Sequence, residues 1–164
     1  MSRPRSIIIL IIWFMWAAGK DLESLARFST TSDYYIFSSQ GLSVLFFLVA
    51  GTIFLLNAAS AWYLFRPEPV GYKVLLATLA ASAAYSIASV LLVLSDLSGA
   101  REAYEIGREV RGLPVREADL NAIFTPKAIG IGLGLSLLVF VAIGALVVRN
   151  KRYFAGPEEF ATEA

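Results

Sequence analysis

The sequence predicts an all-α integral membrane protein in which four transmembrane helices form an antiparallel up-down bundle, with short extracytoplasmic helices between the third and fourth spans. Three observations support this fold class. Hydrophobic residues make up 57% of the chain and charged residues only 16%, whereas a soluble domain is about half apolar and about a quarter charged. The apolar residues gather in one short and three long blocks, and Lys and Arg are denser on alternate connecting segments.

The first apolar block is the shortest of the four. Two arginines precede twelve uninterrupted apolar residues, 7–18. A basic start and a short apolar run are also the plan of a cleaved signal peptide, and residues 17–19 are small, as a cleavage site requires. Trp13 and Trp16 instead resemble the aromatic belt at a membrane interface. We therefore expect an uncleaved span over about residues 6–19, with a cleaved signal peptide as the alternative.

Three longer blocks carry no charged residue. About 20 apolar residues, at about 1.5 Å per residue in a helix, cross a hydrocarbon core about 30 Å thick. Each block is long enough to do so. A short link with two prolines joins the second and third spans, which predicts antiparallel neighbours. Thr125 and Pro126 predict an N-cap and a first helical residue for the last span. The three predicted spans are residues 42–65, 74–95 and 128–148.

The predicted outer loops are residues 20–41 and 96–127. In the second loop, residues 98–111 interleave charges of both signs with weakly apolar positions at helical spacing, which predicts a short helix. A second short helix is expected over residues 115–124. This region is either a docking or ligand-capping surface, or a solvated helix that lies on the bundle.

Charge predicts the orientation. Residues 1–6, 66–73 and 149–164 hold seven Lys and Arg in 30 residues, while residues 19–41 and 96–127 hold seven in 55, beside nine acids. The denser basic set is expected in the cytoplasm. We therefore expect both termini to be cytoplasmic, in a bacterial cytoplasmic (inner) membrane. Residues 1–154 are expected to form one four-helix membrane domain, and residues 155–164 a flexible cytoplasmic tail.

Composition excludes several chemistries. The chain has no cysteine and no histidine, which removes disulfides, thiol redox chemistry and the usual zinc and haem ligands. No catalytic motif was found, so we expect no enzyme activity, no metal and no cofactor. The net charge of +1 gives no reason to expect a nucleic-acid partner.

The polar residues of the second and third spans are the candidate ligand-binding residues. The four candidates are Asn57, Ser82, Tyr85 and Ser89. Asn57 is the most polar of them, and polar side chains inside a membrane are costly. An interhelical hydrogen bond is the more ordinary role for such a residue.

Small residues in the third and fourth spans are the candidate helix-packing residues. They let helix backbones approach closely, either within the chain or against a partner subunit. The glycines fall on two sides of the fourth span, which predicts that this span lies between other helices. The candidates are Ala77, Ala81, Ala84, Ala88, Gly130, Gly132, Gly134 and Gly144.

No motif in the sequence identifies a family. The leading hypothesis is an accessory or assembly subunit without catalytic machinery, which acts through protein contacts in the bilayer with other membrane subunits or as a homo-oligomer. The alternative is a carrier or binder of a hydrophobic small molecule or lipid, which would use a cavity near Asn57 and the hydroxyl groups of the third span.

Overall fold

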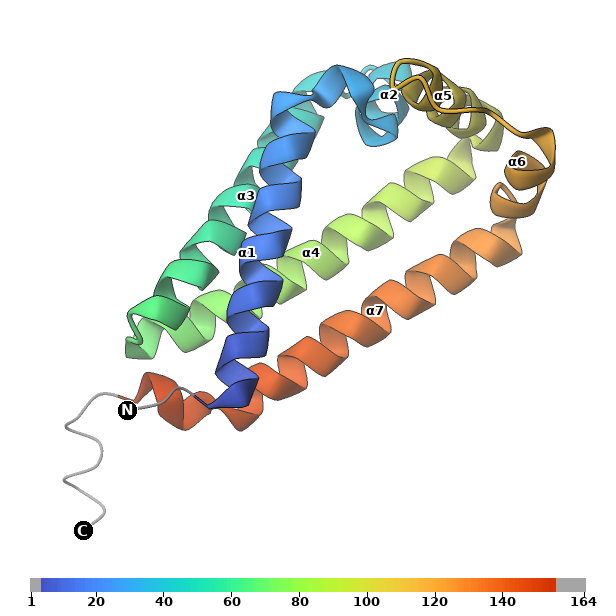
Figure 1. Ribbon diagram of the computed structural model, residues 1–164. Coiled ribbons are helices and arrows are strands. Elements are labelled where there is room, and N and C mark those ends of the chain that lie inside the picture. Colours follow the sequence, from blue (N-terminus) through green and yellow to red (C-terminus); the bar gives the residue numbers. More distant parts are fainter. Residues whose placement is uncertain (1–3, 156–164) are drawn as a thin grey trace, which may run out of the picture.

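The computed structural model describes residues 4–155, which contain seven α-helices, two short 3-10 helices and no strand (Figure 1). All but the first residue of the predicted tail lies outside the described residues. In chain order, the elements are α1 Arg5–Ala26, η1 Phe28–Thr30, α2 Ser32–Ser39, α3 Ser43–Phe65, α4 Pro69–Ser95, α5 Leu97–Glu109, α6 Glu117–Ile123, α7 Pro126–Arg149 and η2 Lys151–Phe154.

Helices α3, α4 and α7 are long and apolar enough to cross a membrane. Their length and composition confirm the three long predicted spans and indicate an integral membrane protein. Helix α4 begins earlier than predicted, at Pro69, because proline fits the first helical turn, where its missing N–H is not needed. The predicted cap of α7 is confirmed, since the Thr125 hydroxyl accepts a hydrogen bond from the Ala128 N–H at 3.1 Å.

Helix α1 is longer than the predicted first span. It continues through Gly19 for two more turns. A glycine inside a helix costs only about 1 kcal/mol relative to alanine. An ion pair one turn apart supports the continuation, with Lys20 Nζ 2.7 Å from Glu23 Oε2. The charged residues that follow the apolar run therefore stay on the same helix.

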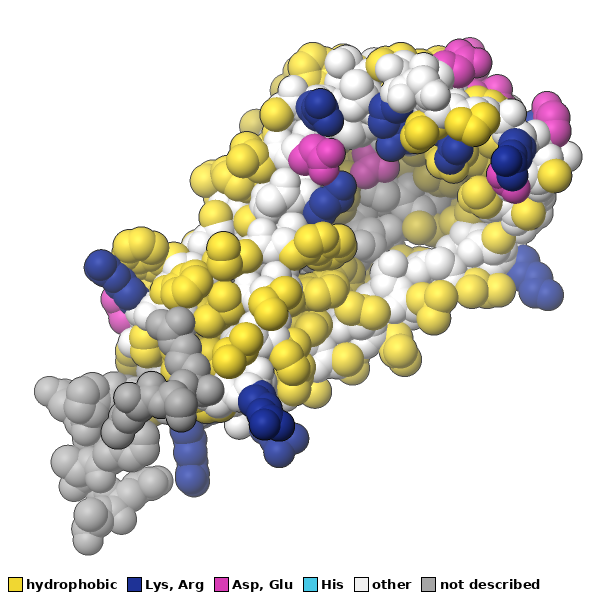
Figure 2. All heavy atoms as spheres, in the orientation of Figure 1, with side chains coloured by type: hydrophobic (Ala, Val, Ile, Leu, Met, Phe, Trp, Pro, Cys, Tyr) yellow, Lys and Arg dark blue, Asp and Glu magenta, His cyan; other side chains and the backbone are white. Residues whose placement is uncertain are grey.

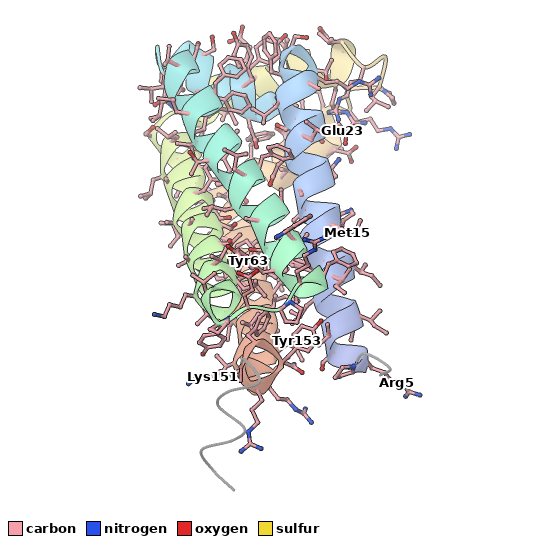
Figure 3. All side chains as sticks on the ribbon, turned by 90° about the vertical axis from the view of Figure 1, so that its left-hand side faces the viewer. Arg5, Met15, Glu23, Tyr63, Lys151 and Tyr153 are labelled. Carbon is pink, nitrogen blue, oxygen red and sulfur yellow. The ribbon has the colours of Figure 1, made fainter. Side chains whose placement is uncertain are left out.

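The hydrophobic core lies at the end of the molecule where α1 begins and α7 ends. Two hydrogen bonds at this end join α1 to the C-terminus of α7 and join η2 to α3. Ser6 Oγ donates to Asn150 Oδ1 at 2.8 Å, and the Tyr153 hydroxyl donates to the Leu64 carbonyl at 2.8 Å. Tyr153 and Tyr63 both lie in this region in Figure 3. The buried core residues are Ile7, Leu10, Ile11, Phe14, Leu64, Leu75, Leu79, Ile143, Val147 and Phe154.

The opposite end of the molecule is covered by a cap made of η1, α2 and α5. Helix α2 was not predicted, and it packs on α5 where a methyl group added at Gly107 would lie 2.9 Å from Ser32 Oγ. Phe37 of α2 is buried, and its ring packs against Phe46 and Tyr85. Helices α5 and α6 fall close to the two segments that the sequence predicts as short helices.

The candidate packing residues do not all contact the rest of the chain. Among the alanines of α4, Ala81 is half-buried, and Ala77, Ala84 and Ala88 are exposed. A methyl group added at Gly130, Gly132 or Gly134 would meet no atom within 4 Å, whereas one at Gly144 would lie 3.8 Å from Leu79 Cδ1. No helix of this chain therefore packs closely on these three glycines in the outer half of α7, and whether α7 lies between other helices stays a prediction. The reason is that the buried residues of α7 belong to its last two turns, where it meets the core.

Candidate ligand-binding cavity

A cavity of about 940 Å³ lies below the cap, bounded by α1, α3 and α4. It reaches up to the segments before α2 and after α5, and α7 contributes only Phe140 to its wall. Figure 2 shows the molecule hollowed between α1 and α7, with acidic and basic side chains around the opening. Its volume is within the range of small-molecule sites, about 300–1,000 Å³.

One face of α1 forms a wall of the cavity. The lining residues recur at intervals of three and four, which places them on a single side of a helix. The first turns supply two aromatic rings, Trp13 and Trp16, whose centroids are 5.8 Å apart. The later turns supply charged and hydroxyl groups, from Lys20 to Arg27. The wall is therefore apolar near the core and polar near the cap.

A carboxylate of α1 meets the most polar residue of α3 inside the cavity. Asn57 Nδ2 donates to Asp21 Oδ2 at 2.7 Å. Asn57 is only 4% exposed and lies in the second half of α3, well inside its apolar length. Asn57 therefore makes an interhelical hydrogen bond, and that bond brings Asp21 to the depth of a predicted span.

A second carboxylate enters the cavity from the cap. The Tyr85 hydroxyl donates to Asp33 Oδ2 at 3.5 Å, a long hydrogen bond between α4 and α2. Asp33 is open to the cavity but surrounded by protein on its other sides. Burial raises the pKa of Asp33 above its usual range, and the hydrogen bond from Tyr85 offsets part of that rise. Asp33 is therefore exposed to the cavity and accepts one long hydrogen bond from Tyr85.

The basic residues of the cavity gather around a different acid. Lys20 Nζ donates to Glu23 Oε2 at 2.7 Å, and the charges of Arg27 and Arg111 also act on Glu23. Lys20 and Glu23 have half-exposed side chains, and Arg111 Nε donates to the Gly107 carbonyl at 2.7 Å. These residues form a solvated, basic mouth near the cap.

The cavity gathers three of the four predicted ligand-binding residues. Asn57, Ser82 and Tyr85 line it, whereas Ser89 is one turn further along α4 and is not among the lining residues. Reasoning from sequence missed Asp21 and Asp33, because both follow the apolar runs and were assigned to a loop. One signal in the sequence could have found Asp21. Trp13, Ala17 and Lys20 follow one another at intervals of four and three, so a helix that continued past Gly19 would carry Asp21 on the same side.

Residues 4–155 contain no group of three or more acidic side chains close enough to hold a metal ion. Compared with models of protein families, with curated proteins and with solved structures, the chain matches none. The function of this protein must therefore be argued from the cavity itself.

Proposed function

We propose that the apolar part of α1, residues 6–19, is a fourth membrane span of an up-down bundle. Its residues Ile7, Leu10 and Phe14 are fully buried in the core shared with α4 and α7. On the other side of the same turns, Ile8, Ile9 and Ile12 are about half exposed or more. A helix that is apolar on both its packed and its exposed faces suits a lipid environment.

The proposed orientation places both ends of the chain in the cytoplasm of a bacterial cell. Arg5 and Lys151 lie at the same end of the molecule in Figure 3, beside the core. Arg66 caps α3 at this end and stacks on Trp62, with its guanidinium carbon 4.7 Å from the ring centroid. Basic residues concentrated at one end of a bundle favour the cytoplasmic side.

Single cysteines in this cysteine-free chain test the four-span topology. Cysteines replacing Ser29 and Asp119 should react with a membrane-impermeant maleimide in intact cells, because the cap and α6 are proposed to lie outside. Cysteines replacing Pro4 and Arg152 should react only after the cells are permeabilised. All four residues are exposed, so accessibility within the protein does not decide the result. Labelling of both Pro4→Cys and Ser29→Cys in intact cells would show that α1 does not cross the membrane.

We further propose that this protein binds a hydrophobic or amphiphilic small molecule or lipid in the cavity. The main support is a cavity of about 940 Å³, with aromatic walls at one end and charged and amide groups at the other. An amphiphile has the same division between an apolar body and a polar group. Sites of this kind are mostly apolar, with a few polar groups that orient the ligand.

Access from the side of the membrane supports this proposal. Helices α1 and α7 are joined at the core, through Ile7, Phe14, Ile143 and Val147. Above the core, α7 adds only Phe140 to the cavity wall, and the hollow opens between the two helices (Figure 2). A molecule dissolved in the bilayer therefore has a path between α1 and α7.

Filling the cavity tests the proposed binding. Ser82→Phe places a ring in the cavity, while Ala84→Phe places the same ring on the exposed side of α4. Protein purified in mild detergent should retain a lipid or other amphiphile, measured by mass spectrometry after extraction. We expect Ser82→Phe to lose most of it and Ala84→Phe to keep it. Equal retention by the two variants would count against the cavity as the binding site.

A role as an accessory or assembly subunit is a second candidate. It is favoured by the exposed small residues of α4 and α7, since close helix contacts in membranes use such surfaces. Ala84 and Ala88 are exposed, and methyl groups added at Gly130 and Gly134 would meet open space. The two proposals use different faces of the bundle, so both can hold.

A further inference from the structure

The two carboxylates inside the cavity have neutral hydrogen-bond partners. Asp21 accepts from the Asn57 amide at 2.7 Å, and Asp33 accepts from the Tyr85 hydroxyl at 3.5 Å. Across residues 4–155, the ion pairs are Lys20–Glu23, Arg101–Glu105 and Arg101–Glu117. Neither cavity aspartate belongs to one of them, so the protein itself leaves their charges uncompensated.

Basic side chains near the cavity do not neutralise these aspartates. Lys20 is bound to Glu23, and Arg27 and Arg111 act on the same glutamate at the mouth. The negative charges of Asp21 and Asp33 both reach the Tyr85 hydroxyl deeper in the cavity. The cavity is therefore divided into a basic mouth and an acidic interior.

Two carboxylates between apolar helices should attract a cation strongly. The attraction between unit charges a few ångströms apart rises from about 1 kcal/mol in water to several kcal/mol near a protein. Asp21 is half-buried, and a charge that is partly removed from water is costly unless it is paired. The aromatic walls formed by Trp13, Trp16 and Phe140 also suit a cation that carries apolar groups, because ring faces attract cations.

We infer that the ligand of this cavity is a lipophilic organic cation, whose charge is held by Asp21 and Asp33 and whose apolar body lies against Trp13, Trp16 and Phe140. The inference rests on the proposed function, which requires a ligand in the cavity, and adds the sign of its charge. Asp21 and Asp33 come from α1 and α2, and Tyr85 from α4, so the site exists only when the cap is seated on the spans.

Two probes of equal shape and opposite charge test the inference. The full-length protein is placed in nanodiscs of phosphatidylcholine, and binding of tetraphenylphosphonium and of tetraphenylborate is measured by equilibrium dialysis, with empty nanodiscs subtracted. We expect the phosphonium to bind and the borate to bind at least about tenfold more weakly. Asp21→Asn and Asp33→Asn should each weaken phosphonium binding about tenfold, and the double variant about a hundredfold.

Controls separate loss of charge from loss of fold. Asp119→Asn removes a carboxylate from the exposed face of α6 and should leave binding unchanged. Asparagine is nearly isosteric with aspartate, and each variant must keep the elution volume and circular dichroism spectrum of the wild type. Phosphonium binding that is unchanged in the folded double variant would overturn the assignment of the two aspartates.

The outcomes distinguish this inference from the proposed function. Borate binding as tight as phosphonium binding, with both lost in Ser82→Phe, would refute the cation preference and leave the cavity as a ligand site. If neither probe binds but the purified protein retains an amphiphile that Ser82→Phe loses, the inference also fails and the proposed function stands. If neither probe binds and no amphiphile is retained, both fail.

Discussion

Replacing Phe14 with alanine is expected to lower the stability of the protein by about 3–5 kcal/mol, the usual cost of removing a large buried aromatic side chain. Phe14 is fully buried in the core, where α1 meets residues of α3, α4 and α7. The smaller side chain leaves a void that the surrounding helices fill only in part. The effect should appear as a lower midpoint of thermal unfolding in detergent, and as a broader elution profile.

The neighbouring residue provides the control for this prediction. Met15 is 53% exposed on the opposite side of α1, so Met15→Ala removes an exposed side chain and leaves the core packing intact. We expect it to shift the unfolding midpoint little. The comparison also tests whether α1 belongs to the folded protein: if Phe14→Ala and Met15→Ala have equal, small effects, α1 is not an integral part of the core.

Replacing Gly71 with alanine is expected to destabilise the protein by about 1–3 kcal/mol, as overpacking usually does. Gly71 is buried in the first turns of α4, and an added methyl carbon would lie 2.7 Å from Tyr63 Cβ and 3.2 Å from Phe154 Cδ1. The Tyr63 Cβ is fixed to the backbone of α3, so the two helices must separate. Because Phe154 packs at the same point, η2 should also be displaced.

A glycine with open surroundings provides the matched control. Gly134 lies inside α7, and a methyl group there would meet no atom within 4 Å. Gly134→Ala should therefore leave thermal stability unchanged, or raise it by up to about 1 kcal/mol through helix propensity. If Gly134→Ala is as damaging as Gly71→Ala, then Gly134 packs against a partner, as the accessory-subunit hypothesis predicts.

The contrast between these two glycines shows where reasoning from sequence stopped. The spacing of glycines in the last span pointed to close packing, but small residues do not identify the helix that approaches them. Gly71 falls in the link that the sequence predicts between the second and third spans, and it is not among the candidate packing residues, although a methyl group added there would lie 2.7 Å from Tyr63 Cβ of α3. Close approach depends on how two helices cross, which is a property of the pair.

The aspartates of the cavity show a similar limit. In the sequence, Asp21 comes just after a short apolar run, and a charged residue at that place predicts the end of a span. The structure extends α1 past this point, and the crossing of α1 and α3 brings Asp21 to Asn57. Asp33 falls in the predicted outer loop, residues 20–41, because the stretch over residues 24–37 is polar. Contact with α5 and α3 makes residues 32–39 a helix.

The sequence alone determined the class of this protein, its three long apolar helices and the N-cap of the last helix at Thr125. It also excluded disulfides, thiol chemistry and the usual zinc and haem ligands, because the chain has no cysteine and no histidine. These features depend on the local composition of the chain, since the cost of placing a segment in a bilayer is summed residue by residue. The tertiary structure alone decided that α1 shares the core, that only the last turns of α7 belong to it, and that Asp21, Asp33 and Asn57 meet in one cavity. Those outcomes follow from helix crossing and packing between residues distant in sequence, and no local pattern encodes the angle at which two apolar helices meet.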